Sequence, residues 1–290
     1  MVISDHEKTN LLITGGSGFL GTKLINCAPG NFYVHSSYLS NYSSEDIRLD
    51  ITDSRSISKA FDQIKPEVVM HSAAYSDCNL CERKPDHAWE INVNGARNIA
   101  QACKVFGSKL VYISSSYIFD GTTGMYDENA SPCPVNQLGR SKVAGEEHVI
   151  QNCSDAIIVR FSISYGYNGP NSNNGFFDRL IEQKRLIVDD SEIRQPPLID
   201  DVAKAVFFLV EKGHQGIFHM GGPNAMTKYE MAKRLESIIR STTLLSPGRS
   251  QDQITPRPFD VTLDCSKILR LGLVFKPIDQ GLLYISENLK

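Results

Sequence analysis

Three glycines near the start of the chain have the spacing of a phosphate-binding turn. The stretch from 10 to 21 reads NLLITGGSGFLG, in which Gly15, Gly18 and Gly21 recur every third residue. The apolar run before them suits a strand buried on both faces, and the residues after them can continue as a helix. Glycines at these places permit a sharp turn, a close approach of backbone N–H groups to a pyrophosphate, and close helix–sheet packing. The motif predicts a dinucleotide site at a helix N-terminus, with a ligand-free glycine turn as the alternative.

The end of the next strand bears on which nicotinamide nucleotide would bind. Residues 31–35 (NFYVH) are predicted to form this strand, and Ser36, Ser37 and Tyr38 follow it. In dinucleotide folds an acidic residue here binds the ribose hydroxyls of NAD and would repel a 2′-phosphate. This strand end has no acid, and His35, Ser36 and Ser37 can donate hydrogen bonds to a 2′-phosphate. We therefore expect NADP(H) rather than NAD(H), with an ordinary polar strand exit as the alternative.

Strand-like and helix-like segments alternate through the first half of the chain. Further strands are predicted at 47–51, 66–74, 109–115 and 156–161, and helices at 54–64, 86–106 and 139–152. This alternation implies right-handed crossovers and predicts an α/β protein with a doubly wound parallel Rossmann sheet, covered by helices on both faces. Ligands of such sheets bind beyond the carboxyl ends of the strands.

The carboxyl ends of the predicted strands supply the candidate cofactor contacts. Asp50 and Ile51 are placed to flank an adenine ring, and small residues end the fourth strand, where backbone must lie against a ligand. With the glycine turn, the candidate set is Gly15, Ser17, Gly18, Phe19, Leu20, Gly21, His35, Ser36, Asp50, Ile51, Ala73, Ala74, Tyr75 and Ser114.

The pattern becomes less regular after Tyr165. A strand is expected at 216–219, a capping box at Thr227–Glu230 opens a helix that runs to Ile239, and 244–259 has the Pro/Ser-rich composition of a loop. We expect residues 1–165 to form the dinucleotide-binding domain. Residues 166–290 would form a smaller α/β substrate lobe, partly interleaved with the sheet.

Bulk properties exclude several classes of partner. The chain has 290 residues, a hydrophobic content of 41% and a formal net charge of −3, so neither nucleic acid nor an anionic membrane is expected as the main partner. No apolar run is long enough to span a bilayer, and the first ten residues carry no apolar signal core. A cytoplasmic protein is the expectation.

The seven cysteines do not form a metal motif. Cys78 and Cys81 make one C-x-x-C pair, but no second pair or pair of histidines completes a zinc set. Free, mostly buried thiols are therefore expected, and no metal site is predicted.

Several stretches together resemble the extended short-chain dehydrogenase/reductase family. They are TGGSGFLG at 14–21, LDITD at 49–53, HSAAYSD at 71–77, INVNGARN at 91–98, YISSSYIFDG at 112–121 and GRSKVAGEE at 139–147. Within this family the chain looks most like the dTDP-4-dehydrorhamnose reductase branch. The stretches GIFHMGGPNAMTKYEMA at 216–232 and RPFDVTLDCSK at 257–267 are similar to the regulatory beta subunit of methionine adenosyltransferase, which belongs to the same branch.

The resemblance implies hydride transfer at a nicotinamide, with one expected group missing. In the family a Tyr hydroxyl protonates the carbonyl oxygen, and a Lys four residues later holds the nicotinamide ribose and lowers the pKa of that Tyr. Ser115 matches the hydroxyl that binds the substrate oxygen, and Lys142 matches the Lys. The Tyr position holds Leu138, because the chain reads LGRSK where the family reads YGRSK. Ser116 stands where close relatives often have Asp.

Leu138 leaves three interpretations open. The protein is a reductase of nucleotide-linked 4-keto-deoxy sugars that takes its proton from water, Tyr117 or Tyr75; or a cofactor-binding regulatory subunit of another enzyme; or an enzyme of altered chemistry that uses Cys78 or Cys133. The expected partners are a small-molecule substrate and either an enzyme or a second copy of the chain. Arg257 either reaches a nucleotide phosphate or pairs with an acid on the lobe surface.

Overall fold

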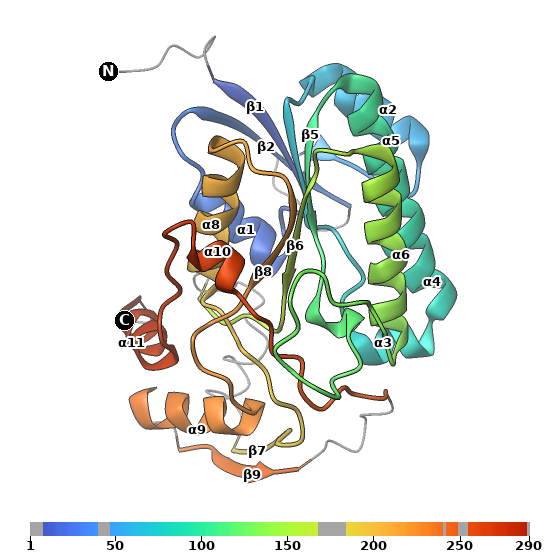
Figure 1. Ribbon diagram of the computed structural model, residues 1–290. Coiled ribbons are helices and arrows are strands. Elements are labelled where there is room, and N and C mark those ends of the chain that lie inside the picture. The colour runs from blue at the N-terminus through green and yellow to red at the C-terminus, as the bar shows by residue number, and fades with distance from the viewer. Residues whose placement is uncertain (1–7, 40–46, 168–183, 240–241, 249–254, 289–290) are drawn as a thin grey trace.

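The computed structural model describes residues 8–39, 47–167, 184–239, 242–248 and 255–288. Within these ranges a seven-stranded parallel sheet forms the centre of the molecule (Figure 1), with the strand order β3-β2-β1-β4-β5-β6-β8. The strands are β1 (Thr9–Thr14), β2 (Phe32–Tyr38), β3 (Ile47–Arg48), β4 (Val68–His71), β5 (Lys109–Ile113), β6 (Ile157–Phe161) and β8 (Gly216–Met220). The predicted doubly wound α/β fold is confirmed.

Two helical layers cover the two faces of the sheet (Figure 1). Helices α2 (Ser54–Ile64), α5 (Ala96–Phe106) and α6 (Gln137–Asn152) lie on one face, and α1 (Phe19–Asn26) and α8 (Ile199–Glu211) lie on the other. Because both faces are covered, the central strands are almost entirely apolar; Leu11, Leu12 and Ile13 of β1 are all 0% exposed. One apolar cluster fills each interface between sheet and helices.

The second strand is longer than the sequence predicted. Residues 31–35 were expected to form it, but β2 continues to Tyr38. The extension comes from pairing with β3, in which Ser37 lies opposite Ile47 and Tyr38 opposite Arg48. The carboxyl end of this strand is therefore at Tyr38 rather than at His35.

The helix predicted at 86–106 is not a regular α-helix along its whole length. It consists of α4 (Pro85–Trp89), a π-helical turn η2 (Glu90–Gly95) and α5, and a short helix α3 (Cys78–Arg83) precedes it. Asn92, on the π-helical turn, is 2% exposed and its side-chain amide binds the backbone N–H and C=O of Tyr75. The turn therefore fixes the loop that leaves β4, which fits the frequent occurrence of π-helical turns at functional sites.

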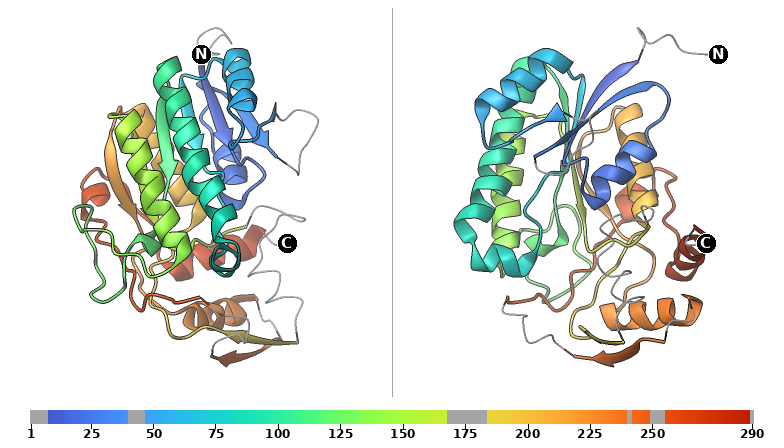
Figure 2. Two further views of the ribbon diagram at one scale, coloured as in Figure 1. Left: turned by 90° about the vertical axis from the view of Figure 1, so that its right-hand side faces the viewer. Right: turned by 180° about the vertical axis from the view of Figure 1, so that it is seen from behind.

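The smaller lobe lies beyond the carboxyl edge of the sheet (Figures 1 and 2). It contains α9 (Lys228–Ile239) and a two-stranded parallel sheet of β7 (Arg185–Val188) and β9 (Leu244–Pro247), with α11 (Ile278–Asn288) packed on α9. The prediction of a loop over 244–259 was wrong for β9, because a partner strand far away in the sequence orders it. The predicted capping box is present: the Glu230 N–H donates to Thr227 Oγ1 at 3.1 Å and the Thr227 N–H donates to Glu230 Oε2 at 2.7 Å.

Candidate active site

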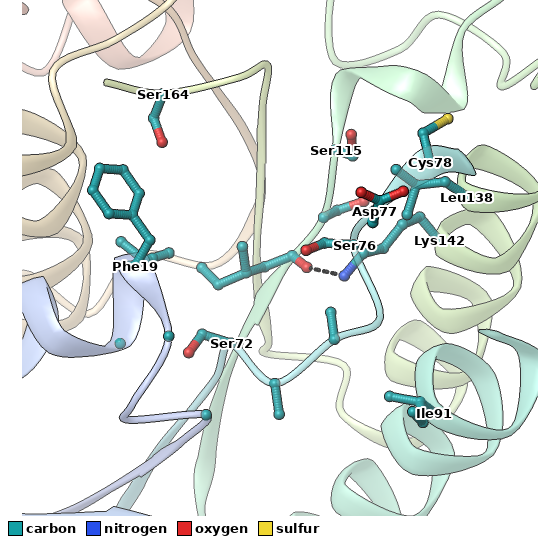
Figure 3. Close-up of a pocket in the computed structure, with 18 of the residues that line it drawn as sticks. Phe19, Ser72, Ser76, Asp77, Cys78, Ile91, Ser115, Leu138, Lys142 and Ser164 are labelled. Carbon is teal, nitrogen blue, oxygen red and sulfur yellow. Dashed lines mark hydrogen bonds between the residues drawn. The ribbon is translucent and has the colours of Figure 1, made fainter. Parts of the chain in front are cut away.

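A cavity of about 780 Å³ lies where the carboxyl edge of the sheet meets the lobe (Figure 3). Residues from six strand ends, from α1 and α6, and from the lobe line it together. The predicted site residues that line it are Gly15, Ser17, Gly18, Phe19, Leu20, Gly21, Asp50, Ile51, Ala73, Ala74, Ser114, Ser115, Leu138 and Lys142. The structure thus brings most of the predicted set to one place.

The glycine turn is shaped by positions that exclude a side chain. Gly15 has a φ of +72°, and a Cβ there would lie 2.8 Å from the backbone N and Cα of Ala73. A Cβ at Gly21 would lie 2.1 Å from the carbonyl oxygen of Gly15, so α1 packs directly on the turn. Gly18 is the N-cap of α1 and makes no side-chain capping hydrogen bond. A helix N-terminus without a capping side chain suits an anionic ligand.

Local hydrogen bonds hold the part of the cavity wall formed by Asp50 and Ile51. The Asp50 carboxylate accepts hydrogen bonds from the N–H of Thr52 at 2.9 Å and from its hydroxyl at 2.7 Å. Ile51 is 7% exposed, and its backbone carbonyl accepts a hydrogen bond from the side-chain amide of Asn98 on α5. This arrangement fixes the loop after β3 against the helix layer.

His35, Ser36 and Tyr75 are not among the cavity-lining residues. The His35 ring packs edge-on against Tyr33, with ring centroids 4.7 Å apart, and the Tyr75 ring packs in the same manner on His87 at 4.8 Å. Because β2 is longer than predicted, the residues that line the cavity at its end are Ser37, Tyr38 and Leu39. None of these three residues is acidic. The strand end on the cavity therefore lacks an acid, as the NADP(H) expectation requires, although it is formed by different residues than predicted.

Ser115 and Lys142 lie near each other on the cavity wall, close to Leu138 and Cys78 (Figure 3). The Ser115 hydroxyl oxygen accepts a hydrogen bond from the N–H of Tyr117 at 3.1 Å, which leaves its own proton available. The Lys142 ammonium donates to the carbonyl oxygen of Ile113 at 2.9 Å. Burial lowers the pKa of Lys142 from 10.5 to about 8, against an opposing effect of the Glu146 carboxylate.

Leu138 lies beside these two residues and is a packed core residue. Its side chain is 5% exposed and belongs to an apolar cluster with Cys78, Tyr117 and Val261. No proton can be delivered from this position, because the side chain has no ionisable group. The structure therefore places the glycine turn, Ser115 and Lys142 around one cavity, with an apolar side chain at position 138.

A buried ion pair that no sequence motif predicted lies next to the strand ends, one helical turn from Lys142. Glu146 and Arg160 have side chains that are 4% exposed each, and their closest atoms are 2.6 Å apart. The Ser114 hydroxyl also donates to Glu146. The available signal was a charged residue inside the otherwise apolar strand AIIVRF, together with a glutamate one helical turn after Lys142.

A second group of charged residues lies on the lobe side of the cavity. Of its members, only Arg257 was a candidate from the sequence. The Tyr117 hydroxyl donates to Glu192 at 3.0 Å and accepts hydrogen bonds from Arg257 at 2.9 Å and from Arg194. Arg194 also pairs with Glu192. Two alternatives were open for Arg257, contact with a nucleotide phosphate or pairing with an acid. Its side chain lines the cavity, and its Nε lies 3.9 Å from Glu192 Oε1. Glu192 and Arg194 fall in a segment whose sequence carried no recognisable motif.

The cysteines are free thiols. Cys78 lines the cavity and burial raises its pKa to about 11, whereas Cys133 is exposed on the surface. Within the described ranges no group of three or more His, Cys, Asp or Glu residues could hold a metal ion. In the same ranges no helix is long and apolar enough to cross a membrane.

Comparison with known proteins identifies the family. The model described as "RmlD substrate binding domain" matches residues 9–285, so the chain belongs to this family and the resemblance inferred from the motifs is confirmed. The chain is 31% identical over 274 residues to methionine adenosyltransferase 2 subunit beta of Xenopus laevis, covering 90% of this chain and 82% of the relative. It is 29% identical to the probable low-salt glycan biosynthesis reductase Agl14 of Haloferax volcanii, covering 88% and 90%.

Solved structures of reductases have the same fold. The dTDP-4-dehydrorhamnose reductase of Bacillus anthracis, in complex with NADP, superposes with a TM-score of 0.86 at 28% identity, covering 97% of this chain and 99% of that one. The hypothetical dTDP-4-dehydrorhamnose reductase of Sulfolobus tokodaii gives a TM-score of 0.83 at 28% identity, covering 93% and 98%. The fold and the parallel central sheet are thus those of this reductase family.

Proposed function

We propose that this protein binds NADP(H) and reduces the carbonyl group of a nucleotide-linked deoxy sugar, in an active site whose usual proton donor is replaced by Leu138. The observation that carries the proposal is the single cavity in which the glycine turn, Ser115 and Lys142 meet. A cytoplasmic location, and assembly with a second copy of the chain, remain predictions.

The residues present fit a nicotinamide dinucleotide. Side chains are excluded at Gly15 and Gly21, where the backbone of the turn and α1 packs tightly, and this is the cradle that a pyrophosphate requires. Asp50 and Ile51 would border the adenine, Ala73, Ala74 and Ser114 would line the middle of the cofactor, and Lys142 would hold the nicotinamide ribose. The non-acidic segment Ser37–Leu39 would tolerate a 2′-phosphate, which favours NADP(H).

The reaction end can bind a carbonyl but lacks the family's proton donor. The bound nicotinamide would supply the hydride. The Ser115 hydroxyl would donate a hydrogen bond to the substrate oxygen, because its own oxygen already accepts from the Tyr117 N–H. The Tyr117 hydroxyl already donates to Glu192, so we assign the proton to water in the cavity. Loss of one general acid slows the chemical step by roughly 10²- to 10⁴-fold.

The decisive experiment is NADPH oxidation with a panel of 4-keto-6-deoxy sugar nucleotides. The Leu138→Tyr variant is expected to be about 10²- to 10⁴-fold faster than wild type, because it restores a phenol four residues before Lys142. Leu138→Phe is the matched control: it adds the ring without the hydroxyl and should not gain activity. Equal rates for wild type and Leu138→Tyr would contradict the proposal, because they would show that position 138 does not limit the reaction.

A second function has two specific observations in its favour. Leu138 is integrated into an apolar cluster, and the chain is 31% identical to a protein named as a subunit of methionine adenosyltransferase. A cofactor-binding subunit without turnover would bind NADPH, show no wild-type oxidation with any substrate of the panel, and co-purify with an enzyme whose kinetics it alters. Measurable wild-type turnover would exclude this second function.

A further inference from the structure

Leu138 raises the question of which ionisable group supplies the proton that a reduction consumes. Apart from the arginines of the lobe wall, whose guanidinium groups do not lose a proton in a protein, the described ionisable residues that line the cavity around this leucine are Asp77, Cys78, Tyr117 and Lys142 (Figure 3). Burial raises the pKa of the Cys78 thiol to about 11, which makes it a poor acid at neutral pH. The Tyr117 hydroxyl already donates to a glutamate, and the Asp77 carboxylate caps α3 by accepting from a backbone N–H. The remaining candidate is Lys142.

The Lys142 ammonium lies close to the position of the missing phenol. Leu138 and Lys142 are four residues apart on α6, so their side chains share one face of the helix, one turn apart. An ammonium group has three N–H donors, and one of them binds the carbonyl oxygen of Ile113 at 2.9 Å. The other two can then bind the nicotinamide ribose and a water in the cavity.

The groups packed around Lys142 leave it charged but acidic. Burial lowers its pKa from 10.5 to about 8, against the opposing effects of the Glu146 carboxylate and of Cys81. Burial also raises the pKa of Cys81 to about 12 and lowers that of His71 to about 3, so both are neutral at pH 7. The Tyr112 ring, whose hydroxyl pKa is also raised by burial, lies 5.1 Å from Nζ. Lys142 is therefore mostly protonated at pH 7, yet roughly 300-fold more acidic than an ordinary lysine.

We propose that Lys142 is the acid of this active site and that its ammonium supplies the proton which the cavity water passes to the substrate oxygen. As hydride adds to the carbonyl carbon, the electron pair of the broken π bond moves to the carbonyl oxygen. This oxygen takes a proton from the water, and the water takes one from Lys142, which becomes a neutral amine and regains its proton from solvent. The inference rests on the proposed function, because it names the proton source of that reaction.

The test is the pH dependence of kcat/KM for the panel of 4-keto-6-deoxy sugar nucleotides at saturating NADPH. Wild type should show a plateau below about pH 8 and a tenfold fall per pH unit above it, because the neutral amine has no acidic proton to give. Lys142→Arg keeps the charge and the N–H donors but cannot release a proton at these pH values. This variant should be at least about 10²-fold slower at pH 7 and should lack the break in the profile.

The matched control restores a phenol to the slow variant. In the double variant Leu138→Tyr, Lys142→Arg the phenol supplies the proton, so the rate should recover by at least about 10²-fold over Lys142→Arg. Leu138→Phe in the same background adds the ring without the hydroxyl and should not recover. If the phenol also failed to restore the rate, the arginine would have disturbed the geometry of the site, and the acid role would be overturned.

Two measurements do not depend on turnover. Calorimetry should show similar NADP⁺ affinity for wild type and Lys142→Arg, because either cation can hold the ribose; lost binding would make cofactor placement the cause of the slow rate and overturn the acid role. Trace acetylation of the cofactor-free protein with acetic anhydride, quantified by mass spectrometry, reports the fraction of neutral amine at each pH. Its midpoint for Lys142 should lie near pH 8, whereas a midpoint near 10.5 would refute the proposal.

The outcomes separate the acid role from the proposed function. Wild-type turnover that stays constant to pH 10, or that falls throughout the range without a plateau, would overturn the acid role and leave the reductase function in place. Absence of wild-type turnover at every pH would refute both.

Discussion

The backbone sets the shape of the cavity at the glycine turn, whereas side chains set it where the carboxyl ends of β5 and β6 form the wall, which we call the β5–β6 end. A Cβ at Gly21 would collide with the Gly15 carbonyl, so the first end admits almost no substitution. The second end combines a packed apolar residue, Leu138, with two unpartnered hydroxyls, Ser116 and Ser162. We therefore expect a substitution at the glycine turn to disturb the backbone more than one at the β5–β6 end of the cavity.

The two ends also differ in buried charge. Next to the β5–β6 end, Glu146 pairs with Arg160 and accepts a hydrogen bond from the Ser114 hydroxyl. Breaking such a pair leaves a buried charge without a partner, whereas the glycine turn depends on the absence of side chains. Four substitutions test the contrast between the two ends.

The largest effect is expected from Glu146→Gln, which leaves Arg160 buried without a counter-charge. Breaking a buried ion pair costs about 3–5 kcal/mol. Chemical denaturation should therefore show a loss of that size in the free energy of unfolding. Asp155→Asn is the control, because Asp155 is 56% exposed in its pair with Lys109 and should lose less than about 1 kcal/mol. Similar losses of stability in both variants would show that the buried Glu146–Arg160 pair contributes no more than the exposed Lys109–Asp155 pair.

Gly21→Ala tests the backbone-shaped end. The added Cβ would lie 2.1 Å from the Gly15 oxygen, so α1 must move, at a cost of about 3 kcal/mol and with loss of NADP⁺ binding. Gly30→Ala should be neutral, because no atom lies within 4 Å of its added Cβ. Calorimetric NADP⁺ binding that survives in Gly21→Ala would place the pyrophosphate elsewhere.

Lys142→Met tests the lowered pKa of this buried lysine through the pH dependence of the free energy of unfolding. Because burial lowers the pKa of Lys142 from 10.5 to about 8, the unfolded chain holds a proton between these values that the folded chain has lost. Stability contributed by this group therefore rises with pH from about 8 to 10.5, and below pH 8 the buried charge carries its full cost. Without cofactor, the variant should gain up to about 3 kcal/mol over wild type below pH 8, a gain that disappears toward pH 10.5. A pH-independent difference between the two proteins would refute a depressed lysine pKa.

The smallest effect is expected from Leu39→Asp, at the end of β2. Leu39 is 52% exposed and lines the cavity, so a carboxylate there remains solvated and should not disturb folding. It should weaken NADP⁺ binding by about tenfold through repulsion of the 2′-phosphate and leave NAD⁺ binding unchanged. Leu39→Asn is the isosteric control and should bind both nucleotides as wild type does. Tighter binding of NAD⁺ than of NADP⁺ by wild type would contradict the cofactor preference.

The sequence predicted best where neighbouring residues decide the structure. The strand–turn–helix at the glycine motif and the capping box at Thr227 depend on residues a few positions apart, and both were predicted. The end of β2 was misplaced because pairing with β3 extends the strand, and β9 was missed because its partner β7 is distant in the sequence. Pairing of that kind overrides local composition.

By itself, the sequence determined the turn that can hold a pyrophosphate and the absence of a phenol at position 138. Both follow from residue type, since only glycine lacks a Cβ and leucine carries no transferable proton. Only the tertiary structure decided that Lys142 has a low pKa, that Glu146 pairs with Arg160, and that Ser116 and Ser162 stay without partners. Burial and hydrogen-bond partners depend on which distant segments pack together, and no local pattern of residues encodes that.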